Sequence, residues 1–151
     1  MKTIIENKKA LFRYQILEKF KAGIVLIGQE VKAIKTGRIS LTGSFVVVRG
    51  EEVFLIGANI PPYQPKNAPK NYEPQRSRKL LLKKAEIKHL IGKVQQKGLT
   101  MVPLKLYTER GKIKLEFGIA RGKKKIDKRE QIKKREVEKE IKRALKRNVR
   151  Q

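Results

Sequence analysis

The sequence predicts a mainly β protein with peripheral helices, arranged as a small antiparallel β-barrel with a basic C-terminal tail. Two observations support this prediction. Short apolar or alternating segments, bounded by glycines, recur between Tyr14 and Gly122, which is typical of antiparallel strands. The β pattern then stops, and residues from Arg121 to Gln151 include fifteen Lys or Arg against five Asp or Glu.

The first half of the chain contains a strand region, a helix and a hairpin. Residues 1–10 are polar and basic and predict an irregular lead-in. Tyr14–Ile27 has a β pattern, and Gln29–Lys35 predicts a short helix that a following glycine ends. Two apolar runs flank a polar Arg-Gly-Glu-Glu turn and predict a hairpin at 44–48 and 53–56.

The middle of the chain begins with a proline-rich stretch. Ala58 to Arg76 holds five of the six prolines, so it predicts a long irregular connection. Leu80 to Lys97 then has a helical apolar stripe and predicts the clearest helix of the body, with Ser77 as its cap. Leu81 and Leu82 fall outside this stripe, either as a second packing contact or as an exposed apolar contact.

The last body segment predicts a second hairpin, with its turn near 109–111. In the return strand four apolar side chains alternate with polar or small ones: Ile113, Leu115, Phe117 and Ile119 against Lys112, Lys114, Glu116 and Gly118. One face therefore belongs to a core and the other to solvent. Six or so short antiparallel strands with outer helices suggest a closed barrel of OB-like character. We expect a barrel domain at 1–125 and a basic tail at 126–151.

The tail has a helical pattern, but a weak one. Its apolar face consists of Val137, Ile141, Ala144 and Leu145. Favourable pairs such as Glu130–Lys134 compete with repulsive pairs such as Arg135–Lys139, each worth roughly 0.2–0.5 kcal/mol. We therefore expect the free tail to be disordered, and to become helical where a partner neutralises its charge.

The net charge of the chain favours a polyanionic partner. The formal net charge is +25 and the pI about 10.5, with no Trp and no aromatic residue after Gly122. A membrane surface also attracts cations, but it usually requires a wide apolar face with Trp or Phe. Nucleic acid is therefore the favoured partner, and no membrane contact is expected. The absence of Cys excludes disulfides and Cys-bearing zinc sites, and we expect a cytoplasmic monomer without a cofactor.

Residues suited to catalysis are sparse. His89 is the only histidine, Asp127 the only aspartate, and the acidic pair Glu51-Glu52 lies in a predicted turn. Two-metal nuclease chemistry needs several converging carboxylates, so the sequence predicts a binding protein without catalytic or metal-ligating residues. Glu30 is an isolated acid on a basic chain. It predicts either a salt bridge with Lys32 or a strand lysine, or a carboxylate that accepts a hydrogen bond from RNA.

Collinear motifs along nearly the whole chain resemble those of a known family. They are Asn7-Lys8-Lys9-Ala10 with Tyr14, Ala22-Gly23-Ile24 through Gly28, Glu30-Val31-Lys32, Gly43-Ser44-Phe45, Pro74 with Arg76 and Arg78, Lys79-Leu80-Leu81-Leu82, Gly98-Leu99-Thr100 through Val102-Pro103-Leu104 and Tyr107, Ala120-Arg121-Gly122-Lys123-Lys124, and Asp127-Lys128-Arg129. On these motifs the chain resembles small protein B, the SsrA-binding protein family of bacterial trans-translation.

The resemblance implies a fold and a function. The fold is an OB-like barrel that binds the tRNA-like domain of transfer-messenger RNA (tmRNA, or SsrA RNA). The function is to deliver this RNA, charged with alanine and accompanied by elongation factor Tu, to a ribosome stalled on an mRNA that lacks a stop codon. The nascent chain then receives a degradation tag. The tail of such a protein tests whether the mRNA path at the decoding centre is empty.

Two sets of site residues follow from the resemblance. The RNA-binding set is Lys8, Lys9, Glu30, Lys32, Leu81, Lys114, Arg121, Gly122, Lys123 and Lys124. The ribosome-binding set in the tail is Asp127, Lys128, Arg129, Ile132 and Lys133. Lys114 also follows from the strand pattern, which places it on the solvent side.

The chain departs from the family pattern at three positions. Lys21 stands where the family usually has Glu. Phe12 stands near the place where relatives often have a histidine that contacts ribosomal decoding bases, and Ile126 replaces a common aromatic residue or histidine.

The competing interpretation is a structural ribosomal protein that binds ribosomal RNA, which would also be small, basic and tailed. An RNA-processing enzyme is disfavoured by the shortage of carboxylates and histidines.

Overall fold

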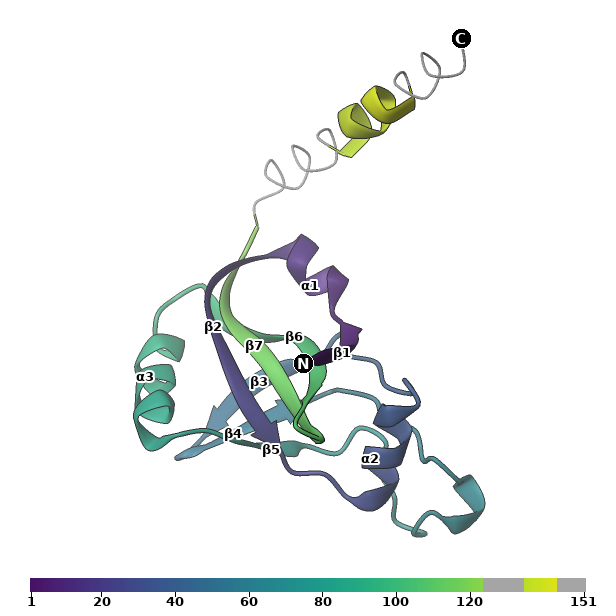
Figure 1. Ribbon diagram of the computed structural model, residues 1–151. Helices are drawn as coiled ribbons and strands as arrows, with labels where there is room; N and C mark the ends of the chain where they lie inside the picture. The colour runs from purple at the N-terminus through teal and green to yellow at the C-terminus, as the bar shows by residue number, and fades with distance from the viewer. Residues whose placement is uncertain (124–134, 144–151) are drawn as a thin grey trace.

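Six antiparallel strands close into a ring in the computed structural model of the chain (Figure 1). The order around the ring is β6-β3-β4-β5-β2-β7, with β7 pairing back onto β6. A seventh strand, β1, pairs with β6 outside the ring. The strands are β1 (Lys2–Glu6), β2 (Tyr14–Ile24), β3 (Phe45–Arg49), β4 (Glu52–Ile56), β5 (Arg78–Leu81), β6 (Leu99–Glu109) and β7 (Lys112–Gly122). The predicted small antiparallel barrel is confirmed.

Helices lie outside this ring. Figure 1 shows α1 and α2 at opposite ends of the barrel and α3 along its side. Their bounds are α1 (Lys8–Arg13), α2 (Gly28–Lys35) and α3 (Lys84–Val94), with one 3-10 turn, η1 (Pro65–Asn67), in the proline-rich connection. The structure describes residues 1–123 and 135–143, and 135–143 are helical. The predictions for Lys124 and for the ribosome-binding set, Asp127, Lys128, Arg129, Ile132 and Lys133, lie outside the described residues.

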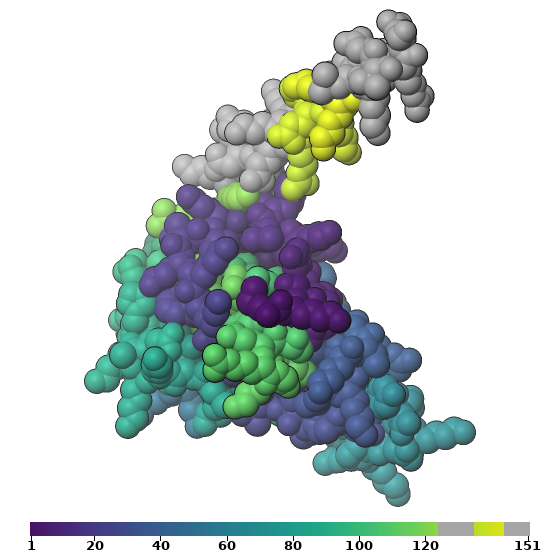
Figure 2. All heavy atoms as spheres, viewed as in Figure 1, coloured from purple at the N-terminus to yellow at the C-terminus, as the bar shows by residue number. Residues whose placement is uncertain are grey.

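The irregular lead-in predicted for residues 1–10 is wrong. These residues form β1 and the start of α1, and the N-terminal residues lie against the last hairpin (Figure 2). Asn7 caps α1, because its Oδ1 accepts a hydrogen bond from the Ala10 amide at 3.3 Å. Its Nδ2 donates to the Pro103 carbonyl at 2.9 Å, and its own amide donates to the Leu104 carbonyl at 2.7 Å. One buried asparagine therefore fastens α1 to β6.

The helix predicted from Leu80 begins too early. Arg78–Leu81 is strand β5, and the helix runs only from Lys84 to Val94. Leu80 is buried within the barrel, where it pairs with Ile24 of β2, so it is no part of the helical stripe. Periodicity alone cannot separate a four-residue buried strand from the first turn of a helix. Ser77 is not the cap of this helix, since the N-cap of α3 is Lys83. The predictions of α2 and of the β3–β4 hairpin are confirmed, with bounds within one residue of those expected.

The last hairpin builds one wall of the core. Leu115 and Phe117 of β7 are completely buried, as the two-residue alternation predicts. The connecting turn places Arg110 at a φ of 53° and Gly111 at 76°. Two consecutive positive φ values match the twist of a two-residue hairpin, which explains the sharp reversal between β6 and β7.

Gly118→Ala is expected to destabilise the barrel by about 1–3 kcal/mol. A Cβ at Gly118 would lie 2.8 Å from Ile16 Cγ2 and 2.9 Å from the Glu18 carbonyl oxygen, beside the bulge in β2. Gly92→Ala is the matched control, because this exposed helical position has no atom within 4 Å of the added methyl. The control should gain about 0.5–1 kcal/mol from helix propensity. Thermal unfolding followed by circular dichroism measures both, and equal shifts would contradict the steric argument.

Candidate nucleic-acid interface

The predicted RNA-binding residues separate into two groups at opposite ends of β7. Lys114 lies near the start of this strand, whereas Arg121 and Gly122 lie at its end. At about 3.3 Å per residue, seven residues of strand place Lys114 roughly 23 Å from Arg121. The structure therefore does not bring the whole predicted set into one cluster.

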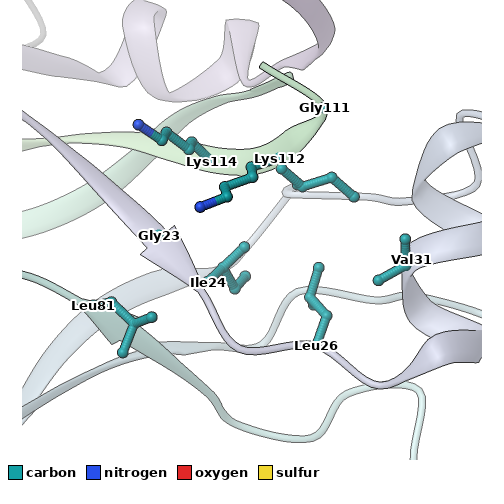
Figure 3. A pocket seen from close by; sticks show the side chains of 9 residues that line it. Gly23, Ile24, Leu26, Val31, Leu81, Gly111, Lys112 and Lys114 are labelled. Atoms are coloured by element: carbon teal, nitrogen blue, oxygen red, sulfur yellow. The ribbon is translucent and has the colours of Figure 1, made fainter. Parts of the chain in front are cut away.

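The first group surrounds an apolar groove of about 330 Å³ (Figure 3). Figure 3 shows Leu81 on one side and Lys112 and Lys114 on the other, with Ile24 between them and Leu26 and Val31 farther along toward α2. Leu81 is 54% exposed, so it does not pack into the core and instead presents an apolar side chain beside the groove. Leu82 is half-buried against the core, which is the packing alternative. The groove combines an apolar floor with two cations at its rim.

The second group surrounds α1. Lys8 and Lys9 are exposed on this helix, and Arg13 and Arg121 are exposed near its C-terminal end. Lys123 is partly occupied with the protein itself, because its amide donates to the Arg13 carbonyl at 2.9 Å and its Nζ to the Leu11 carbonyl at 3.1 Å. Cations at the last turn of a helix also suit its dipole.

The α1 group also meets the helical part of the tail. The Arg135 guanidinium lies 5.6 Å from the centre of the Phe12 ring, within the range of a cation–π contact. The Phe12 ring is therefore used in a contact within the chain.

Glu30 is buried rather than exposed, and the partners expected for it are wrong. Its Oε1 accepts from Arg76 Nη2 at 2.5 Å and from the Ile27 amide at 2.9 Å. Its Oε2 accepts from Arg78 Nε at 2.7 Å, and neither Glu30 nor Arg78 has any exposed side-chain surface. Lys32, the partner predicted from sequence, is exposed on α2 and takes no part. Of the two arginines that pair with Glu30, Arg76 is the one that reaches solvent, with 31% of its side chain exposed.

The electrostatics of this cluster keep Glu30 ionised. Burial alone would raise the pKa of its carboxyl, but hydrogen bonds from Arg76, the Ile27 amide and Arg78 outweigh burial, so the pKa is lowered. Arg78 also donates to the Ala58 carbonyl at 2.7 Å and the Pro74 carbonyl at 2.8 Å, which fastens both ends of the proline-rich connection. The cluster therefore positions the proline-rich loop.

Sequence reasoning did not identify Arg76 and Arg78 as partners of Glu30. The available signal was the two-residue spacing of Arg78 and Leu80, which places both side chains on the same face of a strand. That pattern predicts a buried arginine, and a buried arginine requires an anion. Glu30 was the isolated acid that could supply it.

The described residues offer little for metal or acid–base chemistry. Within 1–123 and 135–143, His, Asp and Glu form no group of three that could hold a metal ion. His89 Nε2 lies 2.9 Å from Glu18 Oε2, but both side chains are more than 40% exposed. No helix in these residues is both long and apolar enough to span a membrane. The barrel surface instead carries an apolar groove with Lys112 and Lys114 at its rim. Lysines in this arrangement can bind a phosphate backbone.

Comparison with known proteins agrees with this description of a basic barrel. Residues 4–147 match the family described as SmpB protein. The SsrA-binding protein of Acaryochloris marina is 51% identical over 148 residues, which is 98% of this chain and 96% of the relative. The SsrA-binding protein of Cupriavidus necator is 54% identical over 144 residues, which is 95% of this chain and 96% of the relative. A chain of a solved structure described as "tmRNA-SmpB: a journey to the center of the bacterial ribosome" is similar with a TM-score of 0.66 and 49% identity, over 80% of this chain and 85% of that one.

Proposed function

This chain belongs to the SmpB protein family, and from that premise we infer that it binds the tRNA-like domain of tmRNA and delivers it to stalled ribosomes for trans-translation. The observation that carries this inference is a family match across residues 4–147, which includes both the barrel and most of the tail. The barrel adds a physical basis, because lysines surround its apolar groove. A structural ribosomal protein is not favoured.

We propose a division of labour between barrel and tail. The barrel cations bind the tRNA-like domain, with Lys112 and Lys114 beside the groove and Lys8, Lys9 and Arg121 at the α1 end. The predicted tail residues, Asp127, Lys128, Arg129, Ile132 and Lys133, bind the ribosome at the decoding centre and along the mRNA path. An acid within a basic run, such as Asp127, can orient neighbouring cations on RNA.

The remaining features of the proposal concern assembly and location. The chain acts as a monomer in the cytoplasm and carries alanyl-tmRNA together with elongation factor Tu. It needs no cofactor and performs no catalysis, since its contribution is to hold one RNA in a ribosomal site. The family resemblance supports these features, and the basic surface of the barrel supports the RNA partner.

Binding to the tRNA-like domain is expected to depend strongly on salt. If the barrel contacts roughly 5–7 phosphates, log K against log salt should slope at about −4 to −6. A gel shift with the isolated tRNA-like domain, repeated over a salt series and with ordinary tRNA as competitor, measures slope and preference together. Salt-insensitive binding, or equal competition by ordinary tRNA, would contradict the proposal. A structural ribosomal protein would instead remain on ribosomes in high salt without tmRNA.

A further inference from the structure

Five lysines share one outer face of the barrel across β2, β6 and β7. They are Lys19 and Lys21 of β2, Lys105 of β6, and Lys112 and Lys114 of β7, and together they are called the lysine face below. The strand register places Lys21 and Lys105 on opposite sides of Glu116, and Gly23 of β2 beside Lys114. β2 and β7 cross the front of the barrel in Figure 1.

The carboxylates on this face hold the lysines only loosely. Glu116 lies 4.0 Å from Lys19 Nζ and 3.9 Å from Lys105 Nζ, and Glu109 lies 3.9 Å from Lys114 Nζ. These distances are at the outer limit of an ion pair, whereas the buried contacts of Glu30 measure 2.5–2.7 Å. Glu6, opposite Lys105 on β1, is the third acid beside the face. Five cations therefore meet three carboxylates and leave net positive charge.

An aromatic ring supports the middle of the lysine face. Tyr107 is fully buried, and both Lys21 Nζ and Lys105 Nζ lie 5.9 Å from the centre of its ring. Contacts of this kind hold ammonium groups above the sheet while their charge stays available. The lysines are therefore arranged on a rigid strand surface rather than on a loop.

We propose that the lysine face binds the sugar–phosphate backbone of the RNA and extends the interface from the groove across β2 and β6. The net positive charge of the lysine face favours a polyanionic partner. It would repel the basic tail of this chain, so the tail is not the occupant. Continuity supports RNA in particular, since Lys112 and Lys114 belong both to this face and to the rim of the groove. Lys19 and Lys21 are then phosphate-binding residues that sequence reasoning did not assign to the interface. This inference depends on the proposed function, of which it is a refinement.

The test uses the full chain with Lys19→Gln and Lys21→Gln combined. Lys79→Gln with Lys88→Gln is the matched control, because both lysines are exposed and lie on β5 and α3. Fluorescence anisotropy with labelled tRNA-like domain between 50 and 300 mM KCl gives affinity and salt slope. The test variant should have a slope shallower by about 1–2 and bind roughly tenfold more weakly near 0.1 M salt. The control should stay close to the unsubstituted chain.

The outcomes separate the two levels of the proposal. If the test variant and the control have equal slopes while the unsubstituted chain binds strongly, the lysine face is not an RNA contact and the proposed function stands. If the unsubstituted chain shows no preference for the tRNA-like domain, both the function and the inference are wrong. Thermal unfolding of each variant, with unchanged midpoints expected at these exposed positions, shows that any lost affinity reflects lost contacts.

Discussion

Glu30→Gln is expected to lower the free energy of unfolding by about 3–5 kcal/mol. The substitution keeps the shape of the side chain but removes the anion between Arg76 and Arg78. Arg78 would then be a fully buried cation with only carbonyl partners. At roughly 2–4 °C per kcal/mol for a chain of this size, the midpoint of thermal unfolding should fall by about 6–20 °C.

Glu52→Gln is the matched control for this prediction. It makes the same chemical change in the Lys79–Glu52 pair, whose side chains are 45% and 53% exposed at 3.3 Å. Exposed pairs contribute at most about 1 kcal/mol, so the control should unfold within a few degrees of the unsubstituted chain. Similar shifts in the two variants would show that burial does not set the value of the Glu30 pair.

The same carboxylate predicts how stability responds to acid. The pKa of Glu30 is lowered in the folded state from its ordinary value of 4.5, so Glu30 of the unfolded chain becomes protonated first as the pH falls. The contribution of Glu30 to the free energy of unfolding is therefore fully present above pH 4.5 and declines below it. The stability difference between the unsubstituted chain and Glu30→Gln should shrink progressively as pH falls below 4.5, and a constant difference would contradict this assignment.

Removing residues 126–151 is expected to abolish tagging on stalled ribosomes while the barrel still binds tmRNA. The deleted segment carries eleven Lys or Arg and five acids, so some nonspecific attraction to RNA will be lost. At 0.15 M salt, where exposed charges more than about 8 Å apart are largely screened, affinity for the tRNA-like domain should change by less than about threefold. Gel shifts measure the affinity, and tagging of a reporter lacking a stop codon measures delivery.

A chain with residues 126–151 in scrambled order is the matched control for the deletion. It keeps the length and charge of the tail but separates Asp127, Lys128 and Arg129 from each other. It should bind the tRNA-like domain as the unsubstituted chain does and still fail in tagging. Recovery of tagging by the scrambled tail would show that charge alone suffices, and a large loss of affinity on deletion would show that the tail itself clamps tmRNA.

The local pattern of the sequence predicts most of the barrel but not its long-range pairings. Alternation correctly places Leu115 and Phe117 inside and Lys114 outside, because a strand has a period of two. β1 was missed because it is a short, polar strand whose partner, β6, lies about a hundred residues away in the sequence. The local pattern of such a strand does not reveal a distant pairing. The partners of Glu30 were missed for the same reason, since Arg76 and Arg78 lie 46 and 48 residues away.

The candidate site was predicted in composition but not in arrangement. Leu81 and Lys114, which the resemblance assigns to the RNA-binding set, both line one groove. Lys8 and Lys9 do not join them, because the pairing of Tyr14 with Gly122 carries α1 to the far end of β7. Such a placement depends on strand register, which no single segment of sequence records.

The ring of strands is closed by two short strand pairings, which are called seams below. β3 meets β6 through the single pair Val46–Met101, and β2 meets β5 through two pairs at Gly23 and Ile24. The barrel therefore consists of two curved sheets, β3-β4-β5 and β1-β6-β7-β2, which are joined by these two seams. Amide protons at such seams exchange by local opening at a lower free energy than those in the long β6–β7 ladder. The β2–β5 seam borders the groove at Gly23 and Leu81, so an RNA bound there would bridge one of the two short pairings that close the barrel.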